Sequence, residues 1–171
     1  QTASASATIS FTTGLDSTYS SYIFKFINIH ASNDGTNFLF QGSVDGGSNY
    51  NIAVTNTAFE AYHAEDDGAY GLAYNATRDS AQGTAFLHLN CGGLDADNDS
   101  CLGGSLQIFN PSSTTFVKHY LVNTNNVLNG YESDNSFMAG YFNNTNAIDA
   151  VQFKMSAGNI DDGIIKLYGV S

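Results

Sequence analysis

Tryptophan is missing from this chain of 171 residues, and basic side chains are scarce, with five Lys and Arg against sixteen Asp and Glu. The formal charge of −11 repels the phosphate backbone of nucleic acids and the headgroups of anionic lipids. Long apolar runs are missing too, because none approaches the roughly 18–20 residues that cross a membrane. We therefore expect no nucleic-acid partner and no membrane partner.

Targeting and catalytic signatures are also absent. The opening stretch QTASASATIS has neither the basic start nor the apolar core of a signal peptide, and since it begins with Gln1 we expect a processed or excerpted chain. Neither G-x-S-x-G nor H-E-x-x-H occurs. A structural role is favoured for the four histidines, which stand singly near the ends of expected strands: His30, His63, His88 and His119. The sequence thus predicts a protein that is not an enzyme, and paired carboxylates such as Asp161 and Asp162 leave a hydrolase only as a weak alternative.

Short runs rich in Ile, Val, Phe, Tyr and Thr are separated by clusters of Gly, Asn, Asp and Ser, whereas helical periodicity is almost absent. Turn signals at intervals of roughly 8–15 residues favour two packed sheets. We predict a single all-β domain over residues 1–171, an antiparallel two-sheet β-sandwich that is jelly-roll-like, with a closed barrel as the alternative. The expected strands are residues 7–12, 22–30, 37–44, 51–55, 71–76, 84–90, 104–109, 116–122, 137–142, 147–155 and 164–170.

Three local patterns refine this prediction. AVQFKM, residues 150–155, alternates strictly, so Val151, Phe153 and Met155 should point to one side of a strand. The later run IIKLYGV is its expected partner in a C-terminal antiparallel hairpin. Asp45-Gly46-Gly47 predicts a tight turn, and residues 56–63, NTAFEAYH, are the best candidate for one or two turns of helix.

The segment CGGLDADNDSC holds both cysteines of the chain, Cys91 and Cys101. The two lie within disulfide reach if the segment folds back as a hairpin, and paired cysteines are common in extracytoplasmic β proteins. We therefore predict a Cys91–Cys101 disulfide. A structural zinc site is not expected, because no histidine stands at a suitable spacing from the cysteines.

The same segment carries three alternate aspartates, Asp95, Asp97 and Asp99. Their spacing matches that of the first three ligands of a calcium-binding loop. Carboxylates also supply hard oxygen ligands, of which Ca²⁺ takes six to eight. The match then ends, since Ser100 stands where the loop needs Gly and Leu106 stands where it needs a bidentate Glu. No cofactor is expected, Ca²⁺ at these aspartates is the alternative, and a solvated acidic turn is favoured over it.

Much of the chain, from about Tyr22 to Val170, resembles a β-sandwich module of virion structural proteins from tailed phages, notably marine ones. One part of the resemblance is F-x-x-S-x-D-G-G-x-x-Y, from Phe40 to Tyr50, and the other is the closing G-N-I-D-x-G-x-I-x-L-Y-G, from Gly158 to Gly169. The resemblance implies a virion location in a tail, fibre, appendage or head-associated position. It supplies no catalytic residues.

Two functions follow from these observations. The first is a non-enzymatic structural protein of a phage virion, a tail-fibre, appendage or capsid-associated subunit that acts by assembling with other virion subunits and with copies of itself, in a virion or extracellular location. The alternative is a carbohydrate-binding or receptor-binding adhesive β-sandwich that contacts a host surface glycan, although Trp, the usual sugar-stacking side chain, is lacking. Several tyrosines are candidates for contact with a sugar or a subunit, although a structural place on a half-buried sheet face is favoured for them: Tyr62, Tyr70, Tyr74, Tyr120, Tyr131 and Tyr141.

Overall fold

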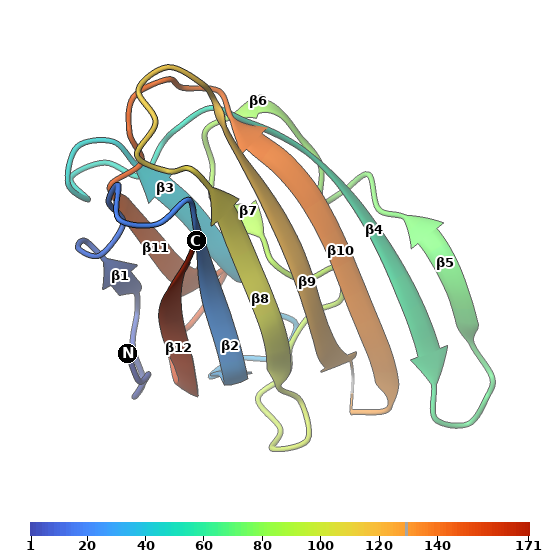
Figure 1. Ribbon diagram of the computed structural model, residues 1–171. Helices are drawn as coiled ribbons and strands as arrows, with labels where there is room; N and C mark the ends of the chain where they lie inside the picture. The colour runs from blue at the N-terminus through green and yellow to red at the C-terminus, as the bar shows by residue number, and fades with distance from the viewer. Residues whose placement is uncertain (129) are drawn as a thin grey trace.

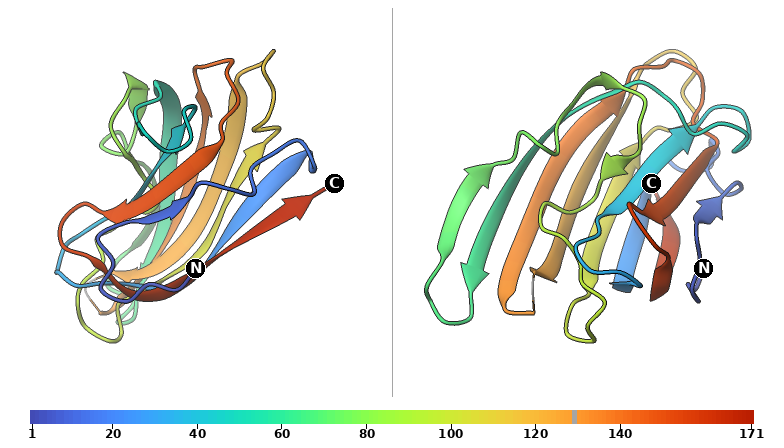
Figure 2. Two further views of the ribbon diagram at one scale, coloured as in Figure 1. Left: turned by 90° about the vertical axis from the view of Figure 1, so that its left-hand side faces the viewer. Right: turned by 180° about the vertical axis from the view of Figure 1, so that it is seen from behind.

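A computed structural model describes residues 1–128 and 130–171 of the chain. Two antiparallel β-sheets pack face to face, as Figures 1 and 2 show, and the described residues contain no helix. These residues therefore also contain no helix long and apolar enough to cross a membrane. The predicted all-β, two-sheet sandwich is confirmed.

The two sheets differ in size. The smaller sheet has the order β1 (Ile9–Phe11), β11 (Ala150–Met155), β3 (Phe38–Ser43) and β7 (Leu87–His88). The larger sheet has the order β12 (Ile160–Val170), β2 (Ser21–Ala31), β8 (Leu102–Phe109), β9 (Lys118–Leu128), β10 (Glu132–Phe142), β4 (Val54–Ala64) and β5 (Tyr70–Tyr74), with β6 (Ser80–Gly83) also paired to β4. Figure 1 views the molecule from the side of the larger sheet, and the right-hand panel of Figure 2 views it from the side of the smaller one. The sheets are open, so the closed-barrel alternative is wrong, while the jelly-roll-like connectivity stays a prediction.

Phe153 of β11 lies at the centre of the core. Its ring centroid is 5.1 Å from that of Phe24 and 5.5 Å from that of Phe26, both on β2 in the opposite sheet. It also contacts Phe11 of β1 at 6.1 Å and stacks on Phe38 of β3 at 5.7 Å. These rings are buried, and edge-to-face packing of this kind adds about 0.5–1.5 kcal/mol per pair beyond area burial. One aromatic cluster therefore joins the two sheets.

The expected C-terminal hairpin does not form. β11 pairs with β1 and β3 in the smaller sheet, whereas β12 pairs with β2 in the larger sheet. The alternation predicted for AVQFKM is confirmed, because Val151, Phe153 and Met155 are all buried. Both strands present an apolar face, and these faces meet across the core, with Ile165 of β12 buried as well. A hairpin would have placed both strands in one sheet and left the other sheet uncovered.

The segment chosen as the best candidate for a helix is strand β4. It pairs with β10 along its whole length, from Val54 opposite Phe142 to Ala64 opposite Glu132. Its burial follows a period of two near its start, where Asn56 is buried and Thr57 is exposed. Long-range pairing on both sides of β4 thus overrides the local sequence preference. The tight turn at Asp45-Gly46-Gly47 is confirmed, because both glycines have positive φ angles of 71° and 84°.

Lys118, the first residue of β9, is fully buried. Its Nζ donates hydrogen bonds to four backbone carbonyls, those of Ser113 (3.0 Å), Phe116 (3.3 Å), Asn144 (2.9 Å) and Asn146 (2.5 Å). Burial lowers the pKa of Lys118. The ammonium group therefore fastens the loop before β9 to the loop after β10, and it is not available to a partner.

Candidate functional site

The larger sheet turns one face to the core and the other away from the smaller sheet. We call the second face the outer face. It extends over β8, β9, β10, β4 and β5, and over the Ile164–Val170 part of β12 with its β2 partners. Because side chains alternate along a strand, the register aligns outer-face residues in rows that cross the whole sheet. The central row is Lys166, Lys25, Ser105, Asn123, Phe137, Phe59 and Tyr74. It runs from two lysines at one end to three aromatic rings at the other.

Among the described strand residues of the outer face there is no Asp or Glu, although the chain has sixteen of them. The sheet carboxylates Glu60, Glu132 and Asp134 alternate toward the core side and line one cavity there. Asp161 and Asp162 lie where β12 is interrupted by register shifts, before Ile164. A molecule with a charge of −11 therefore keeps carboxylates out of the outward strand positions of one broad face. Two carboxylates from loops reach the aromatic end of that face, Asp67 beside His63 and Asp79 at the Tyr74 hydroxyl.

The aromatic end of the outer face is exposed. Phe59 and Phe137 stack on one another with centroids 4.9 Å apart and an interplanar angle of 11°. Beyond them, on β5, Tyr70, Leu72 and Tyr74 are 69%, 74% and 63% exposed. Large apolar side chains gathered on one surface mark sites of interaction more often than single exposed residues do.

At the other end, the outward positions of the described strands hold two lysines. Lys25 and Lys166 stand directly opposite each other on β2 and β12, and both are exposed. The ion pairs found in the described part of the chain involve only His30 and His63, so neither ammonium group has a carboxylate within 4.0 Å there. Like charges placed opposite each other on neighbouring strands are destabilising. No carboxylate among the described residues therefore offsets the repulsion between the two lysines.

A groove of about 380 Å³ lies in the middle of the outer face. Its floor is mainly apolar, with polar side chains along it. The side chains that line it include Phe59, Leu121, Phe137 and Ala139 on the apolar side and Thr57, Ser105, Gln107 and Asn123 on the polar side. Such a groove suits an apolar anchor held by a few hydrogen bonds.

The candidate tyrosines fall in different places. Tyr70 and Tyr74 lie exposed on the outer face, and the 49% exposed Tyr131 lies in the turn before β10. Tyr62 alternates to the core side of β4, and Tyr120 is buried. The outer-face Tyr141 lies beside His119, with ring centroids 6.0 Å apart. A tyrosine by itself did not indicate which face it occupies, because that depends on strand register.

Both cysteines are free thiols in the structure. The backbone N–H of the buried Cys91 donates to Ser136 Oγ of β10 at 2.7 Å. Cys101 immediately precedes β8, and β9 lies between β8 and β10. The two cysteines are thus anchored beside strands that are not neighbours, and no bond joins their sulfurs. The structure therefore does not support the predicted Cys91–Cys101 disulfide.

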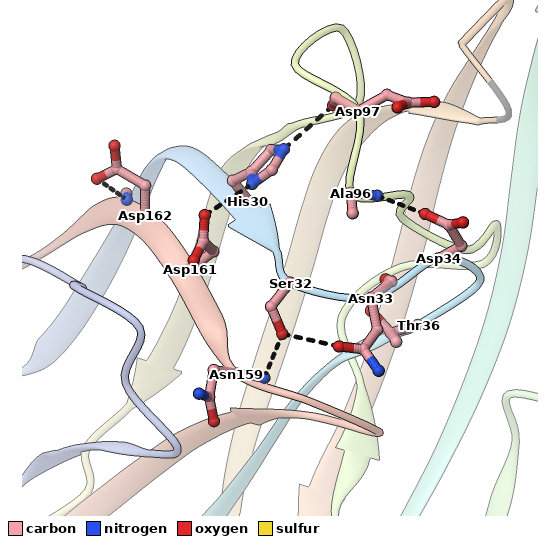
Figure 3. Close-up of polar contacts among 11 residues, drawn as sticks. His30, Ser32, Asn33, Asp34, Thr36, Ala96, Asp97, Asn159, Asp161 and Asp162 are labelled. Carbon is pink, nitrogen blue, oxygen red and sulfur yellow. Dashed lines mark hydrogen bonds and ion pairs between the residues drawn. The ribbon is translucent and has the colours of Figure 1, made fainter.

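The three aspartates of the same segment do not converge. Asp95 Oδ1 accepts a hydrogen bond from the Gly35 N–H at 2.9 Å, while the Asp99 carboxylate lies beside Gly130. Asp97 uses its backbone carbonyl, which lies 3.1 Å from His30 Nε2 (Figure 3). Within residues 1–128 and 130–171 no three His, Cys, Asp or Glu side chains gather as metal ligands. Calcium at Asp95, Asp97 and Asp99 is therefore not supported by their geometry.

Hydrogen bonds instead fasten this loop to the turn after β2. The Ala96 N–H donates to Asp34 Oδ1 at 2.9 Å, and residues Thr36 and Leu94 exchange backbone hydrogen bonds. His30 lies between the loop and β12, because its Nδ1 is 3.7 Å from Asp161 Oδ2 (Figure 3). The acidic loop thus acts as a structural connection between β7 and β8.

A second group of carboxylates, missed at the level of sequence, lies on the core side of β4 and β10. Glu60, Glu132 and Asp134 line a cavity of about 360 Å³ together with Cys91. Burial, followed by the neighbouring Glu60, raises the pKa of the Asp134 carboxyl to about 6. Only the pairing of β4 with β10 brings Glu60 near Asp134, so no spacing in the sequence could have indicated it.

Only part of the outer face could have been predicted from the sequence. The alternation in β9, where Tyr120, Val122 and Thr124 are buried, indicates that Leu121 and Asn123 point outward. The strand order that places them beside Phe137 and Phe59 follows from the pairing of the strands and not from any local motif.

Comparison with known proteins adds no relative. The chain matches no family model, and the searches of curated proteins and of solved structures find no match either. The resemblance to virion modules of tailed phages therefore stays a prediction, and the function is argued from the surface of the molecule.

The two thiols should react differently with a thiol reagent such as DTNB. Burial raises the pKa of Cys91 to about 12, and because the thiolate is the reactive form we expect only Cys101 to react in the native protein. Both cysteines should react after unfolding. The variant Cys101→Ser should not react with the reagent in its native state. A wild-type protein whose cysteines react only after reduction would contain the Cys91–Cys101 disulfide and would contradict this prediction.

Asp134→Asn should stabilise the protein at pH 7.5. The folded protein binds the Asp134 proton more tightly than the unfolded chain, so wild-type stability falls as the pH rises from 3.8 to about 6 and stays lower above that. A pKa raised to about 6 corresponds to about 3 kcal/mol, an upper figure for the gain in the free energy of unfolding. Urea unfolding at pH 7.5 and pH 4 checks this, with the exposed Asp99→Asn as control. An equal effect of Asp134→Asn at both pH values would contradict it.

Proposed function

We propose that the protein is a non-enzymatic structural subunit of a phage virion, in a fibre, appendage or capsid-associated position, that acts by binding other virion subunits through its outer face. The observation that carries the proposal is that no Asp or Glu occupies an outward-pointing position of the described outer-face strands, in a chain whose charge is −11. The virion location rests on the sequence resemblance alone.

Charge gives the physical reason for choosing this face. Two acid-rich surfaces repel each other as they approach, and the cost of desolvating unpaired carboxylates adds to that repulsion. A face made of aromatic, aliphatic and amide side chains can be buried without either cost. The exposed Phe59, Leu121 and Tyr74 supply apolar contacts, and Asn123 and Gln107 supply hydrogen bonds of the kind found in interfaces.

The lysine pair specifies the chemistry of the partner. Lys25 and Lys166 repel each other across β2 and β12, and neither has a carboxylate within 4.0 Å among the described residues. A partner carboxylate placed between them would relieve that repulsion and fix the register of docking. The partner is therefore a protein surface with an acidic group opposite the lysines and an apolar group opposite the groove.

Sugar binding in the groove is the second candidate. A volume of about 380 Å³ lies within the range of small-ligand sites, and Asn123, Gln107 and Ser105 offer hydrogen bonds beside the Phe137 ring. The stacking of Phe59 on Phe137 covers one face of each ring, which leaves less flat surface for a sugar. We therefore favour a protein partner.

Lys25→Glu should abolish incorporation into particles, while Lys154→Glu should not. Both changes alter the net charge equally, but Lys154 belongs to β11 in the smaller sheet, where its Nζ lies 4.4 Å from the centre of the Phe86 ring. Reversing a charge in an interface costs 2 kcal/mol or more, so we expect a loss of at least about tenfold.

The measurement is the amount of each variant in purified particles, with antibody labelling of the wild-type chain by electron microscopy. Absence of the wild-type chain from particles would contradict the virion location. Equal incorporation of the two variants would contradict the role of the outer face. Glycan-array binding that Leu121→Lys abolishes, in a chain absent from particles, would support the second candidate instead.

A further inference from the structure

Strand β5 forms an uncovered edge of the larger sheet. It is the last strand in the sheet order, and Figure 1 shows it at the end of the sheet furthest from β12. Its partner on one side is β4, with Tyr74 opposite Phe59 and Tyr70 opposite His63. Among the described residues no strand pairs with its other side. An edge of this kind offers unpaired backbone groups to another strand.

The hydrogen bonds at both ends of β5 establish which residues face that edge. Ala64 donates its N–H to the Ala69 carbonyl at 2.8 Å, and Asn75 donates its N–H to the Ala58 carbonyl at 3.0 Å. In an antiparallel pair the bonding residues alternate, so odd-numbered residues from 69 to 75 face β4. The N–H and C=O groups of Tyr70, Leu72 and Tyr74 therefore point to the uncovered edge.

This edge lacks the features by which proteins prevent edges from pairing. Such features are lysines, prolines, bulges and very short strands. The sequence of β5 is YGLAY, without charge or proline, and its register with β4 is regular over all five residues. The side chains above the edge, Tyr70, Leu72 and Tyr74, are each more than 60% exposed. The edge is thus suited to pairing.

The strand is also complementary to itself. Read in either direction, YGLAY places a tyrosine at each end, a small residue inside each tyrosine and Leu72 at the centre. In an antiparallel pair of two such strands centred on Leu72, Tyr70 of each copy lies opposite Tyr74 of the other. Gly71 lies opposite Ala73 on the side that faces the core. A two-fold axis through an interface requires this kind of self-complementarity.

We propose that β5 pairs with β5 of a second copy of this chain across a two-fold axis at Leu72. The inference names the partner at one edge of the outer face and in that sense rests on the proposed function. Leu72 of each copy exchanges two hydrogen bonds with its equivalent, and each Tyr70–Tyr74 pair exchanges two more. The two large sheets then form one continuous sheet, and the outer face extends across both copies.

The distribution of charge at β5 is compatible with a second copy. The strand YGLAY has no charged side chain, and two loop carboxylates lie at its ends: Asp67 Oδ1 is 3.2 Å from His63 Nε2, and Asp79 accepts a hydrogen bond from the Tyr74 hydroxyl. Two copies thus meet through an uncharged strand with carboxylates at its two ends. The exposed parts of Tyr70, Leu72 and Tyr74 amount to about 400 Å² per copy, and a strand pair buries the flanks of these side chains that meet across the edge.

Sedimentation velocity of the whole chain tests the pairing. We expect the wild type to sediment as a dimer, and Leu72→Lys to sediment as a monomer, because a charge in the centre of the strand opposes its equivalent. Leu121→Lys is the matched control, since Leu121 is 50% exposed on the same face but lies on β9, and it should remain a dimer. Higher salt should strengthen the wild-type dimer, because it screens the repulsion between acidic copies.

Disulfide trapping locates the axis. In directly opposite bonded residues the Cα atoms are about 5.5 Å apart, within disulfide range. In a Cys101→Ser background, Leu72→Cys should therefore form a cross-linked dimer on mild oxidation, and Leu121→Cys should not.

A wild-type monomer at both low and high salt overturns the inference. A dimer that Leu121→Lys dissociates and Leu72→Lys does not also overturns it, and places self-association on the outer face instead. Neither result bears on the binding of other virion subunits, which the particle-incorporation experiment tests. The two proposals can therefore fail separately.

Discussion

The packing of Phe153 between the two sheets is the contact on which the rest of the structure depends. Phe24 and Phe26 from the larger sheet meet it, so the core-facing positions in this part of β2 are fixed, and alternation then fixes the outward positions between them and beside them. Lys25 must face outward because its neighbours face Phe153. The register of the strands then places Phe59 and Tyr74 on the same outward side of the sheet as Lys25. The outer face is thus a consequence of the core.

The distribution of charge is the second constraint. A chain with few basic residues uses three of them internally: Lys118 caps four carbonyls, the Arg78 guanidinium donates to the Cys91 carbonyl, and Lys154 packs over Phe86. The remaining two stand on the outer face. Carboxylates are placed in loops, on the core side or near the start of β12. Pairing of β5 between copies would join two such faces, and it would give other subunits a surface twice as wide to bind.

Sequence patterns predicted the fold class and most strand positions, because alternation is a local property. They did not predict the partners of strands. AVQFKM was correctly oriented, yet its partners are β1 and β3 and not the following strand, since closing the core required β11 and β12 in opposite sheets. The Cys91–Cys101 segment appeared to be a site because its residues are close in sequence. Lys25, Phe137 and Tyr74 appeared unrelated because they are distant in sequence, although the register places them in one row.

Amide hydrogen exchange at Leu72 and Tyr74 is the sharpest test of pairing through β5, because these N–H groups face its uncovered edge. We expect both amides to be protected in the wild-type protein at high concentration. In the Leu72→Lys monomer the Tyr74 amide should exchange rapidly, while the Gly71 and Ala73 amides, which face β4, should remain protected in both proteins. Rapid exchange at Leu72 and Tyr74 in a wild-type protein that is nevertheless dimeric would show that the copies do not pair through β5.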